Sequence, residues 1–136
     1  MNFYTSSTFR TFLANLTKKP REGYMSVVND ICAQLMGMDD KILRESNDRV
    51  RQQANYRIVK LRLPNSGLKL SKSNGFRLIY WVSLISDEVV LMCIYPKRGS
   101  QSAVDLVDAE YARLLEEMTN ESQANMLIKL ILPMPC

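Results

Sequence analysis

The stretch RIVKLRL at residues 57–63 decides the fold class, because its apolar side chains recur at every second position. A period of two is typical of a β-strand that has one face in the core. In this stretch Lys60 and Arg62 would project together from the other face. The sequence PNSG at residues 64–67 then ends the strand as a turn.

Two further apolar runs follow this strand, over residues 76–84 and 89–95. Only a short turn around Ser86 and Asp87 separates them, which favours an antiparallel hairpin. Both runs are the most apolar parts of the chain. We therefore expect them to be central in a sheet that helices bury on one side.

The segments on either side of these strands have the spacing of amphipathic helices. Residues 1–8 suggest a brief strand followed by N-capping side chains, and apolar residues at helical spacing come next. A second stripe predicts a helix over 22–36 that stops at Gly37. Residues 39–43 suit a short capped turn. A last stripe over 107–118, with acidic residues near its start, predicts another helix.

Two segments leave alternatives open. Residues 45–55 are polar and basic, which fits a helix or a loop. The apolar tail at 124–132 fits a last strand, a helix that docks on the core, or a surface that a partner covers. Residues 1–136 show no repeat and no boundary, so we expect one α+β domain. It would be a small antiparallel sheet with N-terminal helices and a C-terminal helix.

Positive charge gathers in the middle of the chain. Residues 41–80 hold ten basic and two acidic residues, a net charge of +8. Residues 1–40 have a net charge of 0, and residues 81–136 have a net charge of −4. A concentrated positive field attracts polyanions and is typical of nucleic-acid binding. The alternative is that the net charge of +8 comes from a solvated basic helix and a few charged strand positions that bind no nucleic acid.

The composition excludes several kinds of chemistry. The chain has no His, which removes Ser-His-Asp and Cys-His catalysis as well as zinc sites built on His. Its three Cys are widely spaced, so we expect reduced thiols, no metal, no cofactor and a cytoplasmic location. Residues 1–7 lack a basic stretch followed by an apolar one, and no apolar run reaches membrane-spanning length, so we expect no secretory signal and no membrane contact.

Cations and aromatic rings from several segments would converge on the predicted sheet. Such a cluster suits a groove for single-stranded RNA, in which cations hold the backbone and rings stack on bases. The alternative is an ordinary solvated sheet face with the aromatic residues in the core. The candidates are Lys60, Arg62, Lys69, Lys72, Arg77, Lys97, Arg98, Tyr80, Trp81 and Tyr95.

The same region carries an ordered set of motifs. A K-x-R strand at 60–62 precedes a Lys-containing loop at 68–74, and the run GFRLIY occupies 75–80. An aliphatic strand then ends in the sequence YPK at 95–97, and a helix with an acidic start follows. In this order, over about half of the chain, the set resembles the RelE/ParE toxin superfamily, especially its HigB-like branch.

The resemblance implies a small cytoplasmic toxin of a type II toxin–antitoxin system, neutralised by a cognate antitoxin. Toxins of the RelE and HigB branches cut mRNA on the ribosome and so inhibit translation. Toxins of the ParE branch poison DNA gyrase without being nucleases. A plain RNA-binding module of the same fold is a third possibility. The antitoxin is expected to be acidic or amphipathic and to cover the basic face.

The resemblance also implies roles for single residues. Arg77 matches the Arg that contacts the scissile phosphate, and a guanidinium suits that task because it binds phosphate oxygens bidentately. Lys60 and Arg62 match the basic pair on the preceding strand. Lys69 and Lys72 match the loop lysines, and Lys97 matches the Lys after the third strand. The expected reaction is a metal-independent attack of the RNA 2′-hydroxyl on the adjacent phosphate.

Two roles in this reaction stay open. Lys60 or Lys69 would be the general base. The C-terminal catalytic Tyr of RelE has no counterpart in residues 122–136, so Tyr80 or Tyr95 would take its place.

Overall fold

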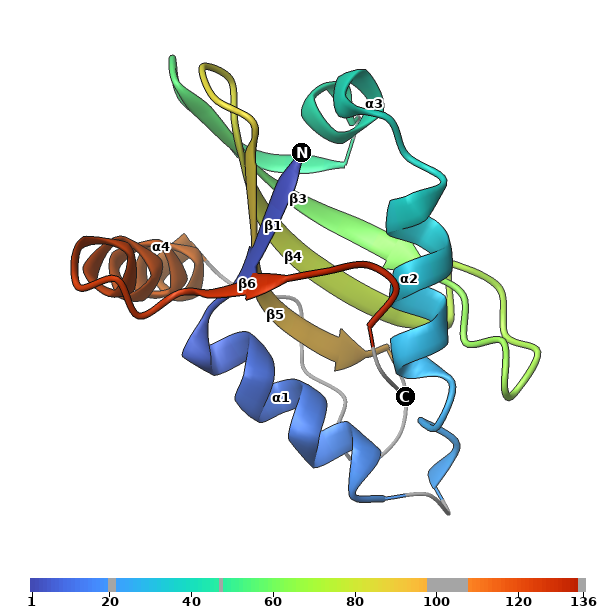
Figure 1. The fold of residues 1–136 in the computed structure, drawn as a ribbon. Coiled ribbons are helices and arrows are strands. Elements are labelled where there is room, and N and C mark those ends of the chain that lie inside the picture. The colour runs from blue at the N-terminus through green and yellow to red at the C-terminus, as the bar shows by residue number, and fades with distance from the viewer. Residues whose placement is uncertain (20–21, 47, 98–107, 135–136) are drawn as a thin grey trace.

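A six-stranded sheet forms the centre of the computed structural model, which describes residues 1–19, 22–46, 48–97 and 108–134 (Figure 1). The strand order is β2-β3-β4-β5-β1-β6. Neighbouring strands are antiparallel except β1 and β5, which are parallel. The strands are β1 (Asn2–Thr5), β2 (Arg49–Gln52), β3 (Tyr56–Leu63), β4 (Phe76–Ser83), β5 (Glu88–Pro96) and β6 (Ile128–Leu130).

Helices cover both faces of this sheet (Figure 1). One face is covered by α1 (Ser7–Thr17), α2 (Val27–Met36) and α3 (Asp40–Glu45), and the other by α4 (Asp108–Gln123). The expectation of helices on one side only is therefore wrong. Helices on both faces explain why β4 and β5 are apolar along nearly their whole length.

The helix starts follow from local capping. The Ser6 side chain accepts a hydrogen bond from the backbone N–H of Phe9, which fixes the start of α1. The Asp39 carboxylate does the same for Ile42 at the start of α3, at 2.8 Å. The predicted α+β class, with N-terminal helices and a C-terminal helix, is confirmed.

Two edge strands lie in the segments that the sequence left open. Residues 45–55 contain a strand, so the expectation of a helix or a loop there is wrong, whereas a last strand was one of the alternatives for the tail. β2 lies within residues 45–55 and pairs with β3, and β6 lies in the apolar tail and pairs with β1. Neither has a hydrophobic period of its own, because each is short and lies at a sheet edge.

Each face of the sheet has its own apolar core. Leu61, Leu78 and Leu91 pack beneath α1 and α2, whereas Ile79 and Cys93 pack beneath α4. Burial in this second core raises the pKa of the Cys93 thiol to about 12, as suits a reduced core residue. No helix in the described ranges has both the length and the hydropathy to cross a membrane.

Candidate nucleic-acid interface

Arg62, Arg77 and Tyr95 share one register position on three neighbouring strands. Arg62 pairs with Arg77 across β3 and β4, and Arg77 pairs with Tyr95 across β4 and β5. Directly paired residues project to the same face of a sheet. Lys60, two positions before Arg62, projects to this face as well. Lys60, Arg62 and Arg77 therefore all project to the face of the sheet that α4 covers.

Arg77 is almost completely buried, with 4% of its surface exposed. One terminal nitrogen of its guanidinium donates to the carbonyls of Lys72 and Phe76, at 2.8 and 3.1 Å. The other donates to the carbonyl of Ser73 at 2.8 Å. In this conformation Arg77 holds the end of the β3–β4 loop and does not present its guanidinium to solvent. Contact with a scissile phosphate, as expected from the sequence, would require the loop carbonyls to release it.

Four further cations lie on the strands and loops next to this buried arginine. Arg62, Lys72 and Lys97 are exposed, and Lys60 is half-buried. Two hydrogen bonds to main-chain carbonyls hold Lys72 and Lys97 near Arg77. The guanidinium of Arg77 donates to the carbonyl of Lys72, and the N–H of Lys97 donates to the carbonyl of Gly75 at 2.8 Å. We call Lys60, Arg62, Lys72 and Lys97 the cationic end of the sheet.

Lys69 lies apart from the cationic end. Its loop is tied to the start of α2, because Gly67 donates its N–H to the Ser26 hydroxyl at 3.0 Å and Ser66 donates to the Asp30 carboxylate at 3.1 Å. The α2 helix covers the opposite face of the sheet. Lys69 itself has a positive φ of 56° at the tip of this loop and is exposed. Its expected partnership with Lys60 and Arg62 is not seen.

Tyr80 does not contribute its ring to the cationic end. It is fully buried on the other face, and its hydroxyl donates to the carbonyl of Leu43 at 2.9 Å. Burial, and then the charge of Asp48, raise the pKa of this phenol. The expectation that Tyr80 contacts RNA is therefore wrong, because its ring cannot reach a base.

Tyr95 projects to the same face as Arg77, but only 2% of its surface is exposed because it lies in the core beneath α4. Trp81 is half-buried and stands nearer the other end of its strand. Arg98 lies outside the described residues. The described part of the expected site is therefore cationic and has no exposed ring from Tyr80 or Tyr95.

The cationic end can bind a polyanion. Lys60 and Arg62 come from β3, Lys72 comes from the loop, and Lys97 follows β5, so the positive groups span three strands. Several cations on neighbouring strands and loops can hold a phosphate backbone by charge without reading its sequence. The exposed guanidinium of Arg62 can also donate two parallel hydrogen bonds to one phosphate.

Comparison with known proteins gives no significant match to a family model, a curated protein or a solved structure. The cationic end and the order of the sequence motifs are therefore the two features that bear on function.

Proposed function

We propose that the chain is the toxin of a type II toxin–antitoxin system and that it cuts mRNA on the ribosome. The observation that supports this most is the register that aligns Arg62 with Arg77 and gathers Lys72 and Lys97 around them. The order of the motifs, which resembles the RelE/HigB branch, supplies the link from a cationic surface to mRNA cleavage.

In this proposal the exposed and half-buried cations do the binding. Arg62 and Lys60 contact the phosphate that is attacked, because they project from the strand toward solvent. Lys72 and Lys97 hold the neighbouring backbone. Arg77 acts as a positioning residue: its hydrogen bonds fix the loop that carries Lys72. Positive charge fixed beside the phosphate stabilises the extra negative charge of the transition state.

The partners follow from the same surface. The cognate antitoxin would cover the cationic end with acidic side chains and so exclude RNA. The ribosome would present the mRNA in the cytoplasm. A second function, RNA binding without cleavage, is favoured by one observation: the guanidinium of Arg77 is already occupied by main-chain carbonyls.

The test is brief induced expression in bacteria, with growth and primer extension on cellular mRNA as readouts. We expect growth arrest and new mRNA 5′ ends that depend on translation. Combining Lys60→Ala with Arg62→Ala should abolish both effects while the circular dichroism spectrum stays unchanged. Lys41→Ala, an exposed cation on α3, is the matched control and should keep full activity.

Three other outcomes would each overturn the proposal. Growth arrest with intact mRNA and lost DNA supercoiling would indicate a gyrase-directed toxin. Normal growth with RNA bound in vitro would indicate a binding module. Cleavage that survives the double substitution would show that the cationic end is not the site.

A further inference from the structure

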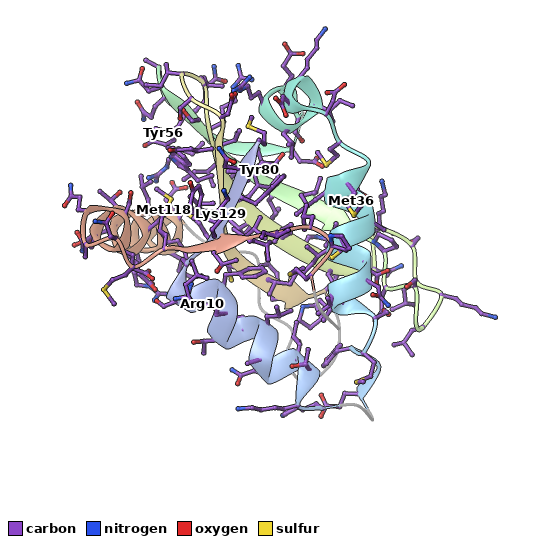
Figure 2. The ribbon with its side chains drawn as sticks, viewed as in Figure 1. Arg10, Met36, Tyr56, Tyr80, Met118 and Lys129 are labelled. Carbon is purple, nitrogen blue, oxygen red and sulfur yellow. The ribbon has the colours of Figure 1, made fainter. Side chains whose placement is uncertain are left out.

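A pocket of about 690 Å³ lies between α4 and the sheet, at the end of the face away from the cationic end. Tyr56 lines it, and this residue lies six positions before Arg62 on β3. The two positions are thus about 20 Å apart along the strand. Figure 2 labels Tyr56 on the sheet and Met118 on α4, and both residues line the pocket. The volume is in the range of small-molecule sites.

Aromatic rings form the sheet side of this pocket. The rings of Tyr56 and Trp81 have their centroids 6.0 Å apart and are tilted by 31°. Tyr4 of β1 lines the pocket too, and the register Tyr4–Val90–Trp81 puts its side chain on the same face. All three rings are half-buried. They therefore offer aromatic surface to an occupant and are not sealed in the core.

The rest of the lining combines apolar side chains, one charged residue and four neutral polar residues, which are Thr119, Ser122, Gln123 and Asn125. Met118 of α4 and Leu127 of the following segment close the side opposite the sheet. Glu88 at the start of β5 is the one charged residue among those described in the lining, and it is exposed. Its carboxylate can therefore meet a ligand at the opening of the pocket. No cation in the described lining competes for it.

We propose that this pocket binds a small organic cation, an ammonium group carried on an apolar or aromatic body. The faces of Tyr and Trp rings attract cations, and an ammonium group near Glu88 gains an ion pair as well. The apolar body would lie against Met118 and Leu127. An anionic ligand would be repelled by the electron-rich faces of the rings and by the carboxylate of Glu88. This inference does not depend on the proposed function, because the pocket shares no residue with the cationic end.

Trp81 makes the test direct, since it is the only Trp of the chain and lies in the pocket wall. The full chain would be titrated with three probes that share a phenyl ring and differ in charge: 2-phenylethylammonium, 2-phenylethanol and 3-phenylpropionate. Tryptophan emission excited at 295 nm is the readout. We expect saturable changes, with the ammonium compound binding tightest and the carboxylate weakest.

Two variants localise the binding. Glu88→Gln should weaken the binding of the ammonium compound roughly threefold to fivefold and leave the affinity for 2-phenylethanol unchanged. Glu116→Gln, on the same helix as Met118 but outside the pocket lining, is the matched control and should change neither affinity. Ser122→Phe, at an exposed position of the lining, should crowd the pocket and weaken the binding of all three probes.

The proposal is overturned by any of three results. One is equal or tighter binding of the alcohol or the carboxylate. Another is an ammonium affinity that Glu88→Gln leaves unchanged. The third is that Ser122→Phe leaves the affinity for all three probes unchanged while it keeps the circular dichroism spectrum of the parent chain.

Discussion

Arg62 and Arg77 lie directly opposite each other on β3 and β4, yet only Arg62 reaches solvent. Like charges in directly opposite positions destabilise a sheet. The arrangement reduces this cost, because the guanidinium of Arg77 turns to the carbonyls of Lys72 and Ser73. The guanidinium of Arg77 is therefore structural, whereas Arg62 is exposed to solvent.

The first prediction separates these two roles by stability. Replacing Arg77 with Met leaves the Lys72 and Ser73 carbonyls without their donor and should lower the free energy of unfolding by roughly 1.5–3 kcal/mol. Arg62→Met, at an exposed position, should change it by less than about 0.5 kcal/mol. Urea unfolding measures both values. Equal losses in the two variants would contradict the assignment.

The second prediction concerns the ionic part of RNA binding. Arg62→Gln should weaken binding of a single-stranded RNA, and the slope of log affinity against log salt should fall by about 0.7, since one phosphate contact is lost. Fluorescence anisotropy at several salt concentrations measures the slope. Lys41→Gln should keep the parent slope, and an unchanged slope in Arg62→Gln would remove Arg62 from the interface.

The third prediction concerns the buried hydroxyl of Tyr80. Tyr80→Phe deletes its hydrogen bond to Leu43 and should cost about 1 kcal/mol of unfolding free energy. RNA affinity should not change, because the ring lies on the face away from the cationic end. A clear loss of RNA binding in a folded Tyr80→Phe protein would contradict this placement.

The fourth prediction concerns the close approach at Gly75. A Cβ atom there would lie 2.1 Å from the carbonyl oxygen of Leu63 and 2.6 Å from the backbone nitrogen of Asn65. Gly75→Ala should therefore destabilise the protein by roughly 1–3 kcal/mol or more, as overpacking does. Gly37→Ala is the control, because its Cβ would meet nothing closer than 3.4 Å. Thermal unfolding should rank Gly75→Ala well below Gly37→Ala.

The fifth prediction is a pH dependence at the contact between α4 and the start of α1. Burial alone would raise the pKa of Glu117, but hydrogen bonds from Thr8 at 2.6 Å and Ser7 at 2.7 Å outweigh it and lower the pKa below its usual value. A lowered acid pKa stabilises the fold above the unfolded value of about 4.3, and the benefit is lost as pH falls through the folded value.

Glu117→Gln should therefore be less stable than the parent chain at pH 7, and the difference should shrink below about pH 4. Urea unfolding at both pH values measures it. Glu116→Gln, whose side chain is exposed on the same helix, should show no such convergence. A stability gap that grows on acidification would contradict a lowered pKa for Glu117.

The sequence predicted the three main strands and α1, α2 and α4 because each has a clear hydrophobic period. It did not predict β2, and it offered a strand at β6 only as one of three alternatives, since strands of four and three residues at sheet edges are too short to show such a period. The second helical layer was also missed. The uninterrupted apolar runs of β4 and β5 were a signal for it, because a strand exposed on one face alternates.

The face on which the site residues lie could be predicted from the sequence, but the solvent exposure of each side chain could not. The period of two places Lys60, Arg62 and Arg77 on one face, and the structure agrees. The same period, followed from Arg77, already puts Tyr80 on the opposite face. The burial of Arg77 could not be predicted, because it depends on where the loop carbonyls of Lys72 and Ser73 lie. The aromatic pocket depends on packing between α4 and the sheet, which spacing does not show.

The position of β1 has a consequence for how the chain is made. Both of its neighbours in the sheet, β5 and β6, are synthesised long after it. During translation β1 therefore has no strand to pair with, and its N–H and C=O groups stay hydrated until most of the chain has emerged. The sheet is therefore completed late, because β1 can pair only after β5 and β6 have been synthesised.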